Sequence, residues 1–371
     1  MAGKAAIIAN PMSGRDVRRL AARATNMTHE AKRDLVARVA AGLDAMGVDE
    51  IMILKEPFRV SSGALEMMPL RARVRLLDVG VTNSAADTVA AVRAARAAGC
   101  DVIISLGGDG TNRIIARTWP DVPLVPLSTG TNNVFPILIE ATSAGVAAGL
   151  IANGSMPAGD VATRCKLVHV RTASWHDIGV IDAVLLRRDH VGNFLPFDAD
   201  RIAALVLTRA EPAAVGMSPI GGYVDPVSFA DEWGLALRCG RAADAPAGVT
   251  HDAAGATHDA AGATHEAAGA THGAFEPGQS TARDLYVPIS PGLFRAVHVA
   301  SHARLPFGAP FVFEGPGVVA FDGDREHKLA DGEQAIVSVQ RDGPPVVDVA
   351  RCIQLAAARG ILSAGAWLPS E

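Results

Sequence analysis

The chain has 371 residues, of which 49% are hydrophobic and 5% aromatic, and its formal net charge is −5. This length predicts roughly two domains with an aliphatic core, and the acidic balance argues against a nucleic-acid-binding protein, which would carry a basic excess. The four cysteines form no closely spaced pair and indicate buried thiols in a reducing compartment. No apolar run reaches the roughly 18 residues that span a bilayer and no signal peptide is recognisable, so we expect a cytoplasmic protein.

The first half of the chain alternates apolar strands with helical patterns. This order is typical of a parallel sheet covered by helices, and such sheets bind ligands beyond the carboxyl ends of their strands. We expect strands at 4–9, 51–54, 73–79, 101–105 and 123–127, and helices at 28–46, 84–98, about 112–117 and about 135–152.

The first expected strand ends in the polar turn Asn10–Gly14. Asparagine, serine and glycine supply side-chain and backbone donors there. Arg15, Arg18 and Arg19 follow directly and could clamp a phosphate group in a bidentate way. The alternative for each arginine is a solvated position in the first turn of a helix.

The stretch Asp101–Thr111 carries the strongest signal, because a strand runs there into a turn with three glycines and one aspartate. The glycines have no Cβ, so their N–H groups can approach an anion closely, and the following helix adds the positive end of its dipole. The turn therefore predicts a phosphate site. Asp109 fits this site if it holds Mg²⁺ or accepts the proton of a hydroxyl that attacks phosphorus. An Asx turn or a helix cap is the alternative.

The strand at 123–127 leads into a third polar turn, Ser128–Asn133, which contains hydroxyls, a glycine and two amides. The carboxyl ends of parallel strands meet at one edge of a sheet. We therefore expect the three polar turns to converge on one site.

After about residue 153 the pattern changes to short β-branched or alternating segments separated by Gly, Pro and Asp. Segments at 166–171, 178–186, 235–238, 285–289, 296–300 and 318–321 are typical of an antiparallel sandwich or barrel. We expect three parts: an α/β domain over 1–155, a β domain over 156–342, and a terminal segment, 343–371, that packs back on the first domain.

A low-complexity insert occupies 245–275 of the second part. Residues 247–274 repeat a seven-residue unit four times and space His251, His258, His265 and His272 seven apart. A helix would align these histidines in a stripe that could bind a transition metal. The alternative is a disordered or loosely helical excursion, because Ala, Gly and Thr offer little apolar surface for packing.

A second acidic turn, Asp322–Asp324, follows the insert. Its two carboxylates flank a glycine and could reach a metal ion or a hydroxyl. The same three residues also predict an ordinary β-hairpin turn.

These motifs together resemble the superfamily that joins NAD kinases with diacylglycerol and sphingosine kinases. The residues that carry the resemblance are Asn10-Pro11-x-Ser13-Gly14, Gly107–Thr111 and Asp322–Asp324. The fuller strings IIANPMSGRDVRRL, LGGDGTNR, LSTGTNNVFP and FDGDRE are similar to the acetoin catabolism protein X group, which is described as ATP-NAD kinase-like. The similarity covers most of the chain, and the histidine repeat departs from it.

The resemblance implies a Rossmann-like amino-terminal domain and a carboxyl-terminal β-sandwich domain, with the active site in the cleft between them. It also implies ATP with Mg²⁺ as phosphoryl donor and, because relatives often self-associate, a homo-oligomer. Asp109 takes the family's catalytic position, Asp322 is a second catalytic candidate, and Asp324 is the candidate metal ligand. The expected nucleotide-binding residues are Asn10, Ser13, Gly14, Gly107, Gly108, Gly110, Thr111, Asn112, Thr129, Gly130, Thr131, Asn132 and Asn133, with Arg18, Arg19 and Arg113 as candidate phosphate clamps.

Two positions depart from the superfamily pattern. Lipid kinases have Gly-Thr-Gly-Asn-Asp where this chain has Thr129–Asn133, so the amide of Asn133 replaces a carboxylate and argues against a metal ion there. The later motif usually ends in glutamate, and Asp324 is one methylene shorter.

We therefore predict an ATP-dependent small-molecule kinase, with NAD as the favoured acceptor. One alternative is a kinase of a small diol, a hydroxyketone or a lipid. The other is a nucleotide-binding regulator without turnover, which Asn133 favours and the intact Asp109 disfavours.

Overall fold

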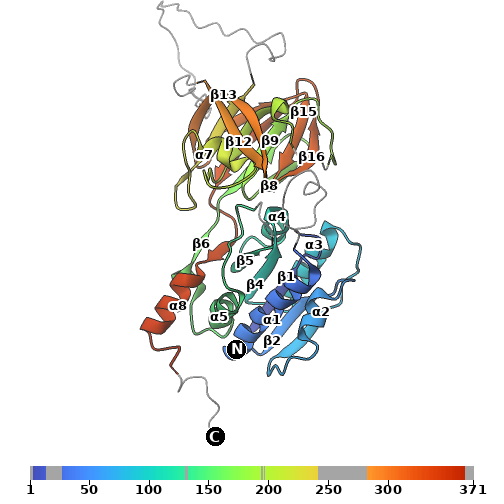
Figure 1. Cartoon of the computed structure of the whole chain (residues 1–371), viewed down its shortest axis with the longest axis vertical. Helices are drawn as coiled ribbons and strands as arrows, with labels where there is room; N and C mark the ends of the chain where they lie inside the picture. Colours follow the sequence, from blue (N-terminus) through green and yellow to red (C-terminus); the bar gives the residue numbers. More distant parts are fainter. Residues whose placement is uncertain are drawn as a thin grey trace, which may run out of the picture.

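The computed structural model describes residues 3–13, 27–129, 133–193, 195, 197–240 and 282–363. The predictions for Gly14, Arg15, Arg18, Arg19, Gly130, Thr131, Asn132 and the repeat at 247–274 lie outside the described residues. The chain forms an α/β domain followed by a β domain, which are stacked along the long axis in Figure 1. Within the described ranges, no helix is long and apolar enough to cross a membrane.

The α/β domain is built on one seven-stranded sheet with the order β3-β2-β1-β4-β5-β18-β6. The first five strands in this order are parallel, and the sequence order reverses between β1 and β4. Polar turns that follow β1 and β4 therefore flank a topological switch point, where ligands of such sheets bind. The strands are β1 (Lys4–Ala9), β2 (Glu50–Leu54), β3 (Arg73–Leu77), β4 (Val102–Gly107), β5 (Leu124–Ser128), β6 (Ala162–Arg164) and β18 (Pro345–Val347).

Helices cover both faces of this sheet, because its central strands are apolar at nearly every position. Ile7, Ile53 and Ile104 pack against α1, α5 and α8, whereas Ile8 and Ile103 pack against α3 and α4. The helices are α1 (His29–Ala45), α2 (Val60–Leu65), α3 (Ala85–Ala97), α4 (Asp109–Thr118), α5 (Ala141–Ala152), α6 (Ala158–Val161) and α8 (Val349–Ala358).

Two helix starts differ from the sequence prediction. The helix α4 begins at Asp109 rather than near residue 112, because Gly108 has the extended backbone of an N-cap. The helix α5 begins at Ala141 rather than near 135, since the Glu140 carboxylate accepts a hydrogen bond from the Ser143 N–H and caps it there. The earlier start of α4 places Asp109 in the first helical turn, where the helix dipole acts.

The β domain consists of two antiparallel sheets, with the orders β12-β13-β11-β10-β9-β15-β16 and β14-β17-β7-β8. Alternate residues of β9 face opposite cores, as the two-residue period requires: Leu185 packs between the sheets and Val184 packs on the outer face. The strands are β7 (Leu167–Arg171), β8 (His176–Gly179), β9 (Asp182–Leu186), β10 (Ile202–Leu207), β11 (Trp233–Cys239), β12 (Arg283–Ser290), β13 (Leu293–Pro306), β14 (Phe311–Glu314), β15 (Gly317–Phe321), β16 (Asp324–Leu329) and β17 (Gln334–Gln340), with the short helices Ala199–Arg201 and α7 (Ser218–Gly222). The predicted fold class, a Rossmann-like domain with a β-sandwich domain, is confirmed.

The single strand expected at 178–186 is two strands, β8 and β9, separated by a turn at Val180 and Ile181. These two residues are apolar and buried, so the sequence pattern shows no break and predicts one strand through the turn. Both pack against the α/β domain in one apolar cluster with Leu124 and Phe135. The turn therefore forms part of the interface between the domains.

The helices α1 and α5 cross closely because glycines lie at the crossing. A Cβ atom on Gly145 would collide with the carbonyl oxygen of Val39 and lie against Gly42. We predict that Gly145→Ala lowers the free energy of unfolding by about 1–3 kcal/mol, the usual cost of overpacking a core. Thermal unfolding would measure this, with Gly159→Ala as the control, because nothing lies within 4 Å of its Cβ position. Equal melting temperatures for both variants would contradict the close crossing.

Candidate active site

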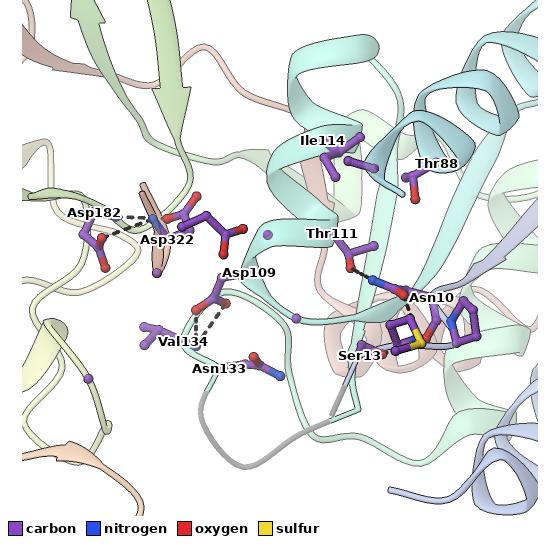
Figure 2. Close-up of a pocket in the computed structure, with 18 of the residues that line it drawn as sticks. Asn10, Ser13, Thr88, Asp109, Thr111, Ile114, Asn133, Val134, Asp182 and Asp322 are labelled. Atoms are coloured by element: carbon purple, nitrogen blue, oxygen red, sulfur yellow. Dashed lines mark hydrogen bonds between the residues drawn. The ribbon is translucent and has the colours of Figure 1, made fainter. Parts of the chain in front are cut away.

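A cavity of about 730 Å³ lies between the carboxyl edge of the parallel sheet and the β domain. The structure brings residues of all the predicted polar turns to it (Figure 2): Asn10, Ser13, Gly108, Asp109, Gly110, Thr111, Asn133, Asp322 and Asp324 line the cavity. Gly107, Asn112 and Thr129 lie behind this lining. Thr129 shares a hydrogen bond of 2.7 Å with the Ser13 hydroxyl, and Asn112 accepts one from Ser105.

The turn after β1 is held from behind by Lys32 of α1. The Lys32 side chain is fully buried, and its Nζ donates to the carbonyl oxygens of Asn10, Pro11 and Ser13 at 2.9, 2.7 and 2.6 Å. Three carbonyl groups of the turn thus point away from the cavity. The Asn10 side chain in turn donates to the Thr111 hydroxyl at 2.9 Å, which joins this turn to the start of α4.

The backbone at the start of α4 can bind an anion. Gly108 caps the helix without a side chain, and a Cβ atom on it would meet Oδ1 of Asn133. The first N–H groups of a helix lack partners within the helix and favour negative charge. Asn133 donates to the Ser128 hydroxyl, so its amide is used to fix the turn after β5.

Asp109 lines the cavity as the first residue of α4. Its carboxylate accepts hydrogen bonds from the N–H groups of Val134 (3.2 Å) and Phe135 (2.9 Å). Burial, and then the negative charge of Asp322, raise the pKa of Asp109 to about 7, against the opposing effect of these two hydrogen bonds and of Arg209. A carboxyl group that titrates near neutral pH can accept or hold a proton during a reaction.

Asp322 explains the break between β8 and β9. Its carboxylate accepts hydrogen bonds from the N–H groups of Val180, Ile181 and Asp182 at 2.8, 2.7 and 3.1 Å. Asp322 and Gly323 both have positive φ, 49° and 95°, as a two-residue hairpin turn of the Asp-Gly type requires. The acidic turn is therefore a β-hairpin turn and also a wall of the cavity.

Asp182 is a member of the site that the sequence analysis missed. It is buried and lines the cavity, and its Oδ1 accepts the N–H of Asp322 at 3.2 Å. Burial and the charges of Asp322 and Asp109 raise its pKa well above the usual value. A signal existed, since Asp182 is the one charged residue in the apolar segment 178–186. Lys32 gave no comparable signal, because it lies on an ordinary helical pattern.

The prediction that Arg113 clamps a phosphate group is not supported by its position. It does not line the cavity. Its guanidinium group is buried one helical turn beyond Asp109 and pairs with Asp177 and Glu326 at 2.8 Å each. It also stacks on the Phe321 ring at 4.6 Å. Arg113 thus ties α4 to two strands of the β domain.

Asp177, Glu326 and His327 form a group of three ligand-type side chains within 4.8 Å, and we found no other such group among the described residues. Asp177 is already paired with Arg113 and Arg117. The arginine charges occupy the place that a cation would take, so this group serves as an ion-pair network.

Comparison with known proteins agrees with these motifs. The model of the ATP-NAD kinase N-terminal domain matches residues 6–155, and that of the acetoin catabolism protein X C-terminal domain matches 166–279 and 253–342. The acetoin catabolism protein X of Cupriavidus necator is 32% identical over 364 residues, which are 94% of this chain and 90% of the relative. This chain belongs to the acetoin catabolism protein X family.

The family membership confirms the resemblance predicted from the motifs. The match to the ATP-NAD kinase N-terminal domain ends at residue 155, before β6 and the β domain. A solved structure of yeast NADH kinase complexed with NADH aligns over 98% of this chain and 88% of that chain, with a TM-score of 0.45 and 13% identity. The match to the ATP-NAD kinase N-terminal domain gives residues 6–155 of this chain a kinase-like fold.

We predict that Lys32→Met weakens the binding of a nucleotide to the cavity by about tenfold or more. Methionine keeps the volume and removes three hydrogen bonds from a charged donor, each of which contributes roughly 1.5–3 kcal/mol in such settings, so the turn loses its orientation. Isothermal titration with ADP would measure the change. Lys55→Met is the control, because it breaks only the exposed pair with Asp78. Equal affinities in the two variants would show that the turn does not depend on Lys32.

The raised pKa of Asp109 predicts how Asp109→Asn changes stability with pH. The unfolded carboxyl ionises near pH 4 and the folded one near pH 7, so the wild-type protein loses stability between these values as pH rises. We expect Asp109→Asn to raise the melting temperature above pH 7 and to leave it unchanged below about pH 4. Thermal unfolding of both proteins over pH 4–8 tests this. A gain that is independent of pH would contradict the shift.

Proposed function

We propose that this chain is an ATP-dependent kinase that transfers the γ-phosphoryl group of ATP to an acceptor hydroxyl. NAD is the acceptor that the name of the matching N-terminal domain suggests. The observation that carries the proposal is Asp109, which lies at the N terminus of α4, in a cavity between two domains, with a pKa raised to about 7.

The α/β side of the cavity suits the triphosphate. The turn at Asn10–Ser13 and the turn at Gly108–Gly110 lie together there, joined by the bond from Asn10 to Thr111. N–H groups at the start of α4 can bind phosphate oxygens, and the helix dipole adds to the attraction. In phosphoryl transfer, positioning and charge stabilisation provide nearly all of the rate.

Asp109 would act on the acceptor side. The acceptor oxygen forms a bond to the γ-phosphorus as its hydroxyl proton moves to the Asp109 carboxylate, and the bond from that phosphorus to the β–γ bridging oxygen breaks, which releases ADP. A base whose pKa lies near the working pH is both ionised and able to take a proton. The hydrogen bonds from Val134 and Phe135 hold the carboxylate in place during this step.

Asp109, Asp182, Asp322 and Asp324 supply oxygen atoms to the cavity lining, although no three of them bring ligand atoms within 4.8 Å of one another. Burial raises the pKa values of Asp109, Asp182 and Asp322; the charge of Asp322 further raises those of Asp109 and Asp182, and the charge of Asp109 further raises that of Asp182. Oxygen ligands of this kind suit Mg²⁺. Because the Asp322 oxygens are bound to backbone N–H groups, we propose Asp324 and Asp182 as the residues that would hold the ion. Bound there, Mg²⁺ would neutralise charge on the phosphoryl group.

We predict that Asp109→Asn keeps the fold and loses most turnover, on the order of a hundredfold or more as expected for a general base. The assay is ADP release with ATP, Mg²⁺ and NAD, and wild-type turnover should rise with pH through about 7, where Asp109 ionises. Asp78→Asn is the control, since Asp78 lies in an exposed pair. Turnover like that of the wild type in Asp109→Asn would remove the proposed role. Binding of ATP without product from any acceptor would indicate the regulator.

A further inference from the structure

We propose that the β-domain side of the cavity is the acceptor subsite and that it takes a small, uncharged alcohol with an apolar body and a second oxygen atom. This inference rests on the proposed phosphoryl transfer and departs from NAD as the acceptor. It is carried by three features of the β-domain lining of the cavity: its apolar surface, the Ser290 hydroxyl, and its charge.

The wall is apolar because three separate segments of the β domain meet there. Phe197, Val215, Met217, Ile289 and Pro291 all line the cavity. The segments are fixed in place. The N–H of Gly216 donates to the carbonyl oxygen of Pro288 at 2.9 Å, and Arg325, itself paired with Asp189, lies 4.5 Å above the Phe197 ring. A preformed wall of this kind binds the apolar part of a ligand rather than a phosphate group.

Ser290 and Ser218 are the hydroxyl residues of this wall, and the Ser218 hydroxyl is already bound to the backbone of Arg209 and Glu211. Ser290 is only 5% exposed as a residue and lines the cavity, and its hydroxyl makes no hydrogen bond with another described residue. A hydroxyl in the lining of a cavity can donate a hydrogen bond to a ligand oxygen or accept one from it. The cavity therefore offers the Ser290 hydroxyl in addition to the Asp109 carboxylate, which suits a molecule with two oxygen atoms.

The charge of the β-domain wall disfavours an anionic acceptor on that side of the cavity. No Lys, Arg or His occurs among the described residues that line the cavity. Its acidic lining residues are Glu56, Asp87 and Asp109 on the α/β side and Asp182, Asp322 and Asp324 on the β-domain side. The nearby Arg209 is engaged by Glu211 and by the Val134 carbonyl oxygen. The diphosphate of NAD would thus meet carboxylates and no cation on this wall, while an uncharged alcohol meets no repulsion.

The position of Asp109 lets the two sides of the cavity work together. Figure 2 shows Asp109 between Asp182 and Asp322 of the β domain and Asn10 and Ser13 of the α/β domain. An alcohol on the apolar wall would give its proton to Asp109 and its oxygen to the γ-phosphorus of ATP. The bond from the γ-phosphorus to the bridging oxygen breaks and ADP leaves with that electron pair.

A series of acceptors tests the proposal. With ATP and Mg²⁺, we expect phosphorylation of ethane-1,2-diol, propane-1,2-diol and butane-2,3-diol, with KM falling by up to about fourfold for each added methylene that the wall buries. NAD should be a poorer acceptor than butane-2,3-diol. Phosphorylation of NAD with none of the diols would overturn the inference and leave the kinase standing.

The variant Ser290→Ala separates the subsite from a general effect on the fold. We expect its KM for butane-2,3-diol to rise roughly three- to tenfold, the effect of one hydrogen bond, with kcat and the KM for butan-1-ol, which has no second oxygen, unchanged. The control is Tyr286→Phe, which removes a hydroxyl from the same hairpin at a side chain that is 69% exposed. Equal KM values for butane-2,3-diol in both variants would overturn the role of Ser290.

A binding measurement distinguishes failure of this inference from failure of the proposed function. Saturation-transfer NMR of butane-2,3-diol would be recorded with the protein and the non-hydrolysable β,γ-imido analogue of ATP. Binding that weakens in Ser290→Ala, with no product from any acceptor, would keep the subsite and refute the kinase. No binding and no product from any diol would overturn the subsite.

Discussion

The site depends on how the Asp322 carboxylate is held. Three backbone N–H groups of the turn between β8 and β9 bind its two oxygens, and its own N–H binds Asp182. This arrangement closes one end of the sandwich and fixes two carboxylates next to Asp109. The same turn packs its apolar side chains, Val180 and Ile181, against the α/β domain. One set of hydrogen bonds therefore sets both the domain interface and the electrostatics of the cavity.

The sequence was sufficient to predict the fold class and the polar turns, because both follow from local rules. A buried parallel strand is apolar at every position, and its carboxyl end must lie at the ligand edge of the sheet, so Asn10 and Asp109 could be placed together. Asp182 and Lys32 could not be assigned, because their roles come from chain segments far apart in sequence. Lys32 acts on a turn about 20 residues earlier, and Asp182 meets a hairpin 140 residues later.

Arg113 shows why residue type alone does not identify a phosphate ligand next to a glycine-rich turn. An arginine after a glycine-rich turn is a reasonable phosphate ligand, but side chains four apart on a helix are neighbours along one face. Four residues after Asp109, Arg113 lies a full turn deeper and meets Asp177 and Glu326 of the β domain. A buried arginine needs such partners. The ion pairs of Arg113 therefore join the two domains. Its charge also lowers the pKa values of Asp322 and Asp182, against the larger effect of burial.

The two halves of the cavity differ because two architectures meet there. A parallel sheet with helices presents N–H groups and helix N termini at its carboxyl edge, which favours anions. In the antiparallel sandwich the strands pair their backbone N–H and carbonyl groups with one another, so side chains face the cavity. Here they form an apolar wall with the Ser290 hydroxyl. The carboxylates lie at the boundary, where burial keeps the pKa of Asp109 near 7. A proton acceptor at that boundary lies between the side that binds the anionic phosphate groups and the apolar wall that binds an uncharged alcohol. This is the order of groups that transfer of a phosphoryl group to an alcohol requires.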